Sequence, residues 1–94
     1  MKNNQKTIEV TRGAYGFGHE WTLVAYGKRF YLGQDSKFCS RVLGMSPSVV
    51  VDEIGSSDLR DEKVLQRLAE FICFHLELDE ATAEALQPWE LCCQ

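Results

Sequence analysis

The hydrophobic pattern changes its period once along the chain, and this change constrains the fold more than any other feature. Up to Leu32 apolar residues tend to alternate with polar ones, which is the pattern of half-buried β-strands. From Gln34 onward apolar residues recur every three or four positions, which is typical of amphipathic helices. The sequence therefore predicts an α+β protein, with strands in the N-terminal third and helices afterwards.

The N-terminal third contains three short runs with the composition of strands, at residues 7–12, 20–26 and 29–32. The last two runs are joined by Gly27-Lys28, and glycine at the first position of a two-residue loop favours a type II′ hairpin turn. These signals predict a three-stranded antiparallel sheet.

The predicted turn sorts the hairpin side chains between two faces of the sheet. In this register Tyr26 lies opposite Arg29, and residues two apart along a strand share a face. The inward face then carries Trp21, Leu23, Ala25, Phe30 and Leu32. The outward face carries Thr22, Val24, Tyr26, Arg29 and Tyr31. We expect the first set to lie in the core and the second to remain accessible.

Beyond Gln34, capping residues delimit the helical segments, and we expect four or five helices in all. They cover residues 35–43, 47–54, 59–77 and 80–87. Ser46-Pro47 is the strongest start signal, because a hydroxyl cap precedes a proline at the first helical position. We expect the helices to pack on one face of the sheet with residues 59–77 at the centre, and Trp89 and Leu91 to fold back onto the core. The chain is predicted to form a single domain, 1–94, with residues 1–6 flexible.

Composition predicts a cytoplasmic protein without a membrane segment. No apolar run approaches the ~20 residues of a membrane-spanning helix, and the opening MKNNQKTIEV contains no apolar stretch that could act as a secretion signal. The four cysteines lack the regular spacing of a disulfide scaffold, so we expect free thiols.

The chain is a small acidic protein whose charge is unevenly distributed. The net charge is −4. Residues 1–41 carry seven Lys or Arg against three acids, whereas residues 42–94 carry three against eleven. An acidic C-terminal half repels phosphate backbones, which disfavours nucleic acid as a partner.

Residues 38–55, FCSRVLGMSPSVVVDEIG, resemble the helix-turn-helix of bacterial DNA-binding regulators, with Gly44 at the turn. A recognition helix reads base edges with Arg, Lys, Asn or Gln, but this second helix offers Ser48, Val49, Val51, Asp52 and Glu53. A structural role in the core fits these residues better. A nucleic-acid-binding regulator that uses this degenerate unit, or the basic hairpin, is the alternative function.

No pattern in the sequence indicates catalysis, a metal site or a cofactor. Cys73 and His75 are two positions apart on a predicted helix and point to different faces, and no CxxC or HExxH motif occurs. No thiol or hydroxyl has a base within predictable reach. We therefore expect a protein that is not an enzyme.

The residues best suited to binding are aromatic and basic side chains predicted to be exposed. We expect a partner protein to contact the glycine-rich loop and the outward sheet face through Tyr15, Phe17, His19, Tyr26, Lys28, Arg29 and Tyr31. Phe74 shares a helical face with Arg67, Glu70 and Glu77; it is a candidate for self-association as a homodimer, or for contact with Trp89. The predicted function is a non-catalytic protein-interaction module or a small accessory or inhibitory factor.

Overall fold

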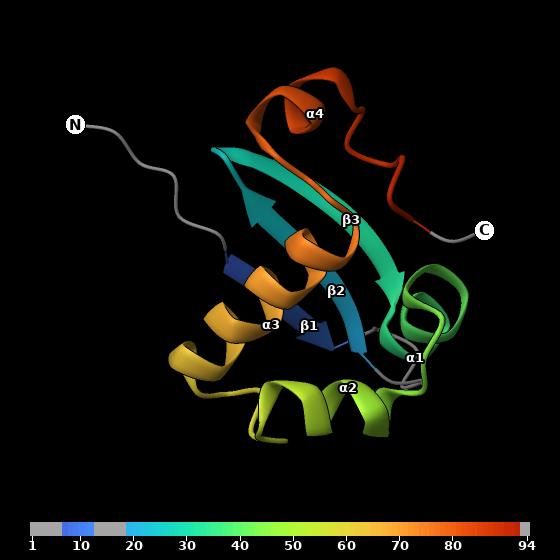
Figure 1. The fold of residues 1–94 in the computed structure, drawn as a ribbon, viewed down its shortest axis with the longest axis vertical. Helices are drawn as coiled ribbons and strands as arrows, with labels where there is room; N and C mark the ends of the chain where they lie inside the picture. The colour runs from blue at the N-terminus through green and yellow to red at the C-terminus, as the bar shows by residue number, and fades with distance from the viewer. Residues whose placement is uncertain (1–6, 13–18, 93–94) are drawn as a thin grey trace.

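Three antiparallel strands form the sheet of this computed structural model, which describes residues 7–12 and 19–92. The strands β1 (Thr7–Arg12), β2 (His19–Ala25) and β3 (Lys28–Gln34) lie in that order, with β2 in the middle (Figure 1). Helices follow along the chain, so the predicted α+β class is confirmed.

The turn between β2 and β3 differs from the predicted one. Tyr26 and Gly27 form the two-residue loop, with φ of 56° and 74°, and Ala25 pairs with Lys28. Positive φ at both loop positions is the geometry of a type I′ turn, whose twist matches that of the strands. The predicted type II′ turn at Gly27-Lys28 was wrong. That prediction assumed that only glycine would take a positive φ, but Tyr26 takes one as well.

The predicted sorting of side chains nevertheless holds for the buried face. The observed turn lies one residue earlier in the chain, so Leu23 pairs with Phe30 instead of Leu32. Because both strands shift by one residue, each side chain keeps its face. All five residues expected to point inward are buried: Trp21, Leu23, Ala25, Phe30 and Leu32. A bulge between Trp21 and Thr22 then brings Trp21 opposite Gly33, which has a φ of 84°.

The first helical segment is a short α-helix that continues as a π-helix. α1 (Asp35–Lys37) leads directly into η1 (Phe38–Leu43), and Gly44 ends the segment with a φ of 74°. The predicted range of 35–43 is therefore observed, although its C-terminal part is wound more widely than an α-helix. η1 buries Phe38, Cys39 and Leu43.

The next helix has the predicted bounds, and the two after it are shorter than predicted. α2 (Pro47–Ile54) begins after Ser46, whose side chain accepts a hydrogen bond from the Val49 N–H. α3 (Glu62–His75) is capped by Asp61 and not by Asp58, because the Asp58 carboxylate instead accepts from the Arg60 N–H in the preceding turn. α4 (Glu80–Ala85) is capped by Asp79.

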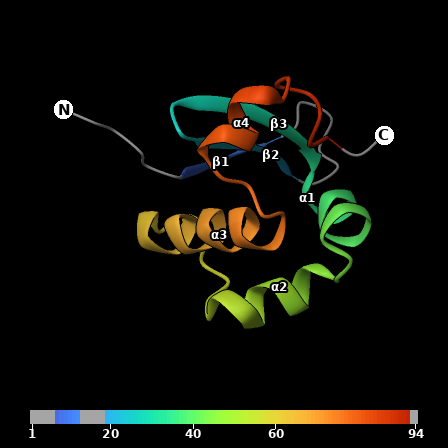
Figure 2. The same cartoon turned by 45° about the horizontal axis from the view of Figure 1, so that its top comes forward.

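α3 lies across one face of the sheet, where it contacts β1 and β2, and α2 packs beneath α3 on the side away from the sheet (Figure 2). The largest fully buried side chains come mainly from the sheet and α3, among them Ile8, Phe30, Leu68 and Ile72, and η1 adds Phe38. Among the described residues no polar or charged residue is buried. The core is therefore a single apolar cluster.

The segment after α4 runs along the outer edge of β3 (Figure 1). The Tyr31 N–H donates to the Pro88 carbonyl over 2.8 Å, and a Cβ on Gly33 would lie only 3.3 Å from the Cys92 Sγ. Leu91 packs against the core as predicted, but Trp89 is 61% exposed, so the expectation that Trp89 folds back onto the core was wrong.

Candidate functional site

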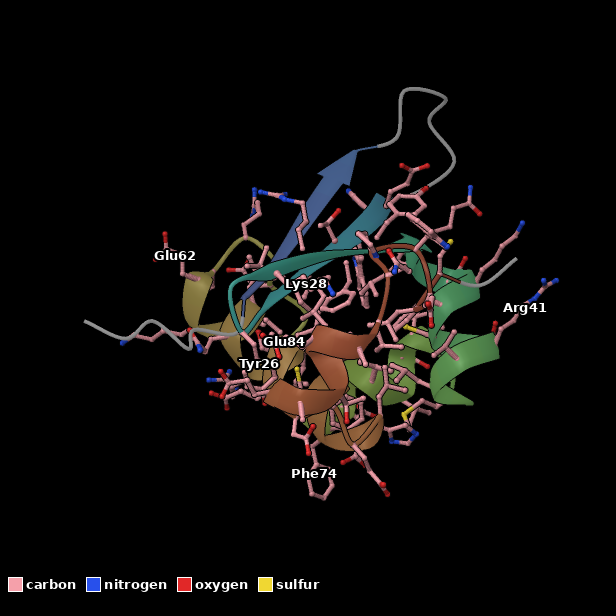
Figure 3. All side chains as sticks on the ribbon, turned by 90° about the horizontal axis from the view of Figure 1, so that it is seen from above. Tyr26, Lys28, Arg41, Glu62, Phe74 and Glu84 are labelled. Carbon is pink, nitrogen blue, oxygen red and sulfur yellow. The ribbon has the colours of Figure 1, made fainter. Side chains whose placement is uncertain are left out.

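Two residues predicted to contact a partner instead make contacts within the chain. The Tyr26 hydroxyl donates to the Leu78 carbonyl over 3.1 Å, and its ring packs against the core. Lys28 Nζ donates to the carbonyls of Ala83 and Glu84 at 3.0 and 3.2 Å, and also to that of Leu86. Figure 3 shows Tyr26, Lys28 and Glu84 close together. The expectation that Tyr26 lies on the outward sheet face was therefore wrong.

Arg29 and Tyr31 lie on the outward face of the sheet, as predicted. Both are exposed, and they pair across the hairpin with Val24 and Thr22. His19 begins β2 and is half-buried. Tyr15 and Phe17 of the predicted binding loop, like the N-terminal residues 1–6, lie outside the described residues. The structure thus places the predicted hairpin residues in two separate locations.

The helix-turn-helix-like unit contributes buried side chains to the core from both of its helices. Val50 and Ile54 of α2 are buried, and the exposed residues of that helix include Val49, Asp52 and Glu53. An exposed helix face with two carboxylates and no basic side chain does not provide the contacts with bases and phosphates that a recognition helix needs.

A surface centred on Phe74 combines the large apolar side chain with the highest exposed fraction among the described residues with two adjacent hollows. Phe74 is 83% exposed and points away from the body of the protein (Figure 3), so it does not pack against Trp89 as one of the two sequence predictions proposed. One hollow has a volume of about 380 Å³ and the other of about 280 Å³, and Phe74 and Glu70 line both.

We define the Phe74 surface as the residues that line these two hollows. The smaller hollow is formed where α2 ends against α3 and the larger where α3 turns toward α4. Together they are lined by Glu53, Ile54, Arg67, Glu70, Phe71, Cys73, Phe74, Glu77, Leu78 and Asp79. The Arg67 Nε donates to the Ile54 carbonyl over 3.0 Å, which ties the two helices together at the smaller hollow.

The electrostatics of the Phe74 surface are dominated by carboxylates. Glu53, Glu70, Glu77 and Asp79 lie around it, against the single guanidinium of Arg67. The Thr82 N–H donates to the Asp79 carboxylate over 2.8 Å, and this bond lowers the pKa of Asp79. Asp79 therefore stays ionised at neutral pH, and the surface carries net negative charge.

The larger hollow depends on an unusual helix end. The Glu77 N–H donates to the Phe74 carbonyl and the Leu78 N–H to the Cys73 carbonyl, at 3.1 and 2.8 Å, which together make a Schellman motif. The residue that turns the chain in this motif is usually glycine, but here it is Glu77, with a φ of 53°. The turn buries Leu78 beside Cys73 and leaves Glu77 exposed at the rim.

No metal centre is found in the described part of the chain, and the thiol of Cys39 is poorly reactive. No group of three or more potential metal ligands occurs in residues 7–12 and 19–92. Cys39 is buried, and burial together with the charge of Asp35 raises its pKa to about 11. A thiol with so high a pKa is a poor nucleophile at neutral pH.

No described helix is long and apolar enough to cross a membrane.

Comparison with protein-family models, with curated proteins and with solved structures finds no match to this chain.

The sequence indicated part of the Phe74 surface. Helical spacing placed Phe74 on one face with Arg67, Glu70 and Glu77, and the structure confirms that these four residues line the same surface. Glu53 and Ile54 could not be assigned to it, because they arrive through the packing of α2 against α3. Asp79 was missed because its position depends on the left-handed turn at Glu77.

Proposed function

We propose that this protein is a non-catalytic protein-interaction module that contacts its partner through the Phe74 surface. The exposure of the Phe74 ring carries the proposal. A phenylalanine side chain that is 83% exposed contributes little to the core, and phenylalanine is a weaker helix former than alanine, leucine or glutamate. Folding alone therefore does not favour this residue on the exposed face of the last turn of α3.

Binding does favour it. Aromatic rings are frequent energetic centres of interfaces, and burying a phenylalanine side chain is worth about 1.5–3 kcal/mol. The shallow hollows on either side of the ring add surface that partner side chains can cover as they bury the ring. A protein with this surface acts by occupying part of its partner, as an accessory or inhibitory factor does.

The remaining features of the proposal concern the cellular setting. We also propose a cytoplasmic location, which is supported by the lack of regular disulfide-type cysteine spacing in the sequence. Arg29 and Tyr31, on the outward sheet face, form a second contact region of the same module.

The test is affinity capture from the native host with three proteins: the unchanged chain, Phe74→Ser and Val49→Ser. Val49 is a matched control because it is 42% exposed on α2 and does not line either hollow. We expect Phe74→Ser to keep its thermal stability, since the side chain is exposed. Its affinity for the captured partner should nevertheless fall at least about tenfold, which is a loss of about 1.4 kcal/mol of binding free energy.

The control should capture the same partners as the unchanged chain. Full retention of every specific partner by Phe74→Ser contradicts the proposal.

A further inference from the structure

We infer that the partner is another protein, which binds the Phe74 surface through a basic segment. Apolar side chains of the same segment enter the two hollows. This inference rests on the proposed function and adds the chemical class of the partner. It is carried by the charge around the hollows, by the apolar residues within them and by the conformation of Glu77.

Charge complementarity selects a basic segment. Four carboxylates and one guanidinium surround the hollows, and the guanidinium is held by its bond to the Ile54 carbonyl. Within the described residues, Glu53, Glu70 and Glu77 make no side-chain hydrogen bond or ion pair. Lysine or arginine side chains brought close to these carboxylates gain attraction and raise the rate of association, whereas acidic segments are repelled.

The apolar residues of the hollows define the other half of the partner's chemistry. Ile54 and Phe71 lie in the smaller hollow, and Cys73 and Leu78 in the larger, with the Phe74 ring between them. Two separate apolar depressions on either side of a ring fit two apolar side chains of one segment. A segment that carried only basic residues would leave both hollows empty.

The same charges argue against a second copy of this chain. A symmetric dimer through Phe74 brings each surface against itself, because the two subunits contribute the same patch. Such pairing brings together two patches of the same net negative charge, and like charges across an interface are unfavourable. The phosphates of nucleic acid meet the same repulsion.

The backbone at Glu77 supports a role for this carboxylate in binding. Glycine adopts a φ of 53° without strain, but glutamate does not. Strained backbone conformations that persist are concentrated at functional sites. A charged side chain at this position therefore costs stability and provides a carboxylate at the rim of the larger hollow.

The experiment selects peptides from a random library displayed on phage against the immobilised full chain, and then measures the affinity of the enriched peptides by fluorescence anisotropy. We expect the enriched peptides to be rich in Lys and Arg and to contain at least two large apolar residues. Phe74→Ser should weaken their binding about tenfold or more.

Two triple variants separate local charge from net charge. Glu53→Gln/Glu70→Gln/Glu77→Gln removes carboxylates from the Phe74 surface and keeps Asp79, which caps α4. Glu62→Gln/Glu80→Gln/Glu84→Gln removes the same number of charges elsewhere and serves as the control. The first variant should weaken binding roughly fivefold or more, and the second less than about twofold.

Failure of the inference and failure of the proposed function give different results. The enriched peptides could depend on Phe74 and yet contain no excess of basic residues, or bind both triple variants equally. Either result overturns the basic class of the partner and leaves the proposed function standing. Peptides that bind Phe74→Ser as tightly as the unchanged chain overturn both. A selection without enriched peptides overturns the inference alone, as does a dimer in sedimentation that Phe74→Ser dissociates.

Discussion

At the scale of the single residue, Glu77 shows how a local conformation and a surface charge are connected. Its left-handed backbone ends α3, forms the Schellman motif and turns the chain toward α4. Glycine is the residue that suits this position best on conformational grounds, and a non-glycine residue there costs about 1 kcal/mol. The side chain that glycine lacks lies at the rim of the larger hollow.

We therefore expect Glu77→Gly to raise the free energy of unfolding by about 1 kcal/mol and to weaken binding of a basic segment. Urea denaturation measures the first effect and fluorescence anisotropy the second. Glu77→Gln is the control, because it removes the charge and keeps the strained backbone: it should leave stability unchanged and weaken binding equally. A Glu77→Gly protein less stable than the unchanged chain contradicts this account.

At the scale of the element, the short helix α4 is held by the turn of the hairpin. Its six residues are too few to form a stable helix alone. Lys28, next to the turn, donates from its ammonium group to three carbonyls at the C-terminal end of α4, where the helix dipole also favours a positive charge. The interaction between the hairpin and α4 therefore compensates for the shortness of the helix.

Removing this ammonium group should loosen α4 selectively. Lys28→Met keeps the aliphatic side chain and loses the charged donor, at a cost of about 1–2 kcal/mol to the local structure. In hydrogen exchange, the amides of α4 should lose protection and those of α3 should keep theirs. Lys37→Met, at an exposed position of α1, is the control and should change neither. Unchanged protection of α4 in Lys28→Met contradicts the role assigned to Lys28.

At the scale of the whole molecule, the protein has one apolar core, and none of the described charged residues is buried in it. The pH dependence of its stability therefore rests on few groups. Cys39 is one of them, because its pKa is raised from 9.0 to about 11 in the folded protein by burial and by Asp35. Below pH 9 the thiol is protonated in both folded and unfolded states. Above it the unfolded chain loses the proton first, so the folded state loses stability.

The contribution of Cys39 to stability should therefore be complete below pH 9 and fall by on the order of 2 kcal/mol as the pH rises to 11. Guanidinium denaturation across this range measures the loss. Lysine and tyrosine also titrate there, so the difference from Cys39→Ala isolates the thiol. The stability of Cys39→Ala should fall less steeply with pH, and parallel curves for the two proteins contradict the prediction.

Much of the fold could be predicted from the sequence, for reasons that particular elements show. The signals for α2 are local, since Ser46, Pro47 and Gly55 are its own neighbours, and its bounds were predicted correctly. The buried face of the hairpin was also predicted correctly, although the turn and the outward position of Tyr26 were not. A shift of one residue on each strand preserves the alternation of side chains. The start of α3 was wrong because Asp58 and Asp61 are both capable caps.

The candidate site was less predictable because it depends on tertiary contacts. Helical spacing was sufficient to place Phe74 on a charged face. It could not show that Ile54 approaches from α2, or that Tyr26 turns inward to reach Leu78. These contacts join residues far apart in sequence, and no local pattern records them.

The hydrogen bond from Tyr26 to Leu78 joins residues 52 positions apart, and Leu78 lines the larger hollow of the Phe74 surface. The shape of that hollow is therefore set in part by a side chain of the β2–β3 turn that does not line it. If a partner binds the Phe74 surface as we propose, we expect variation in the turn to change its affinity from a distance, because a chain that replaces Tyr26 keeps every residue of that surface and loses the bond that positions Leu78.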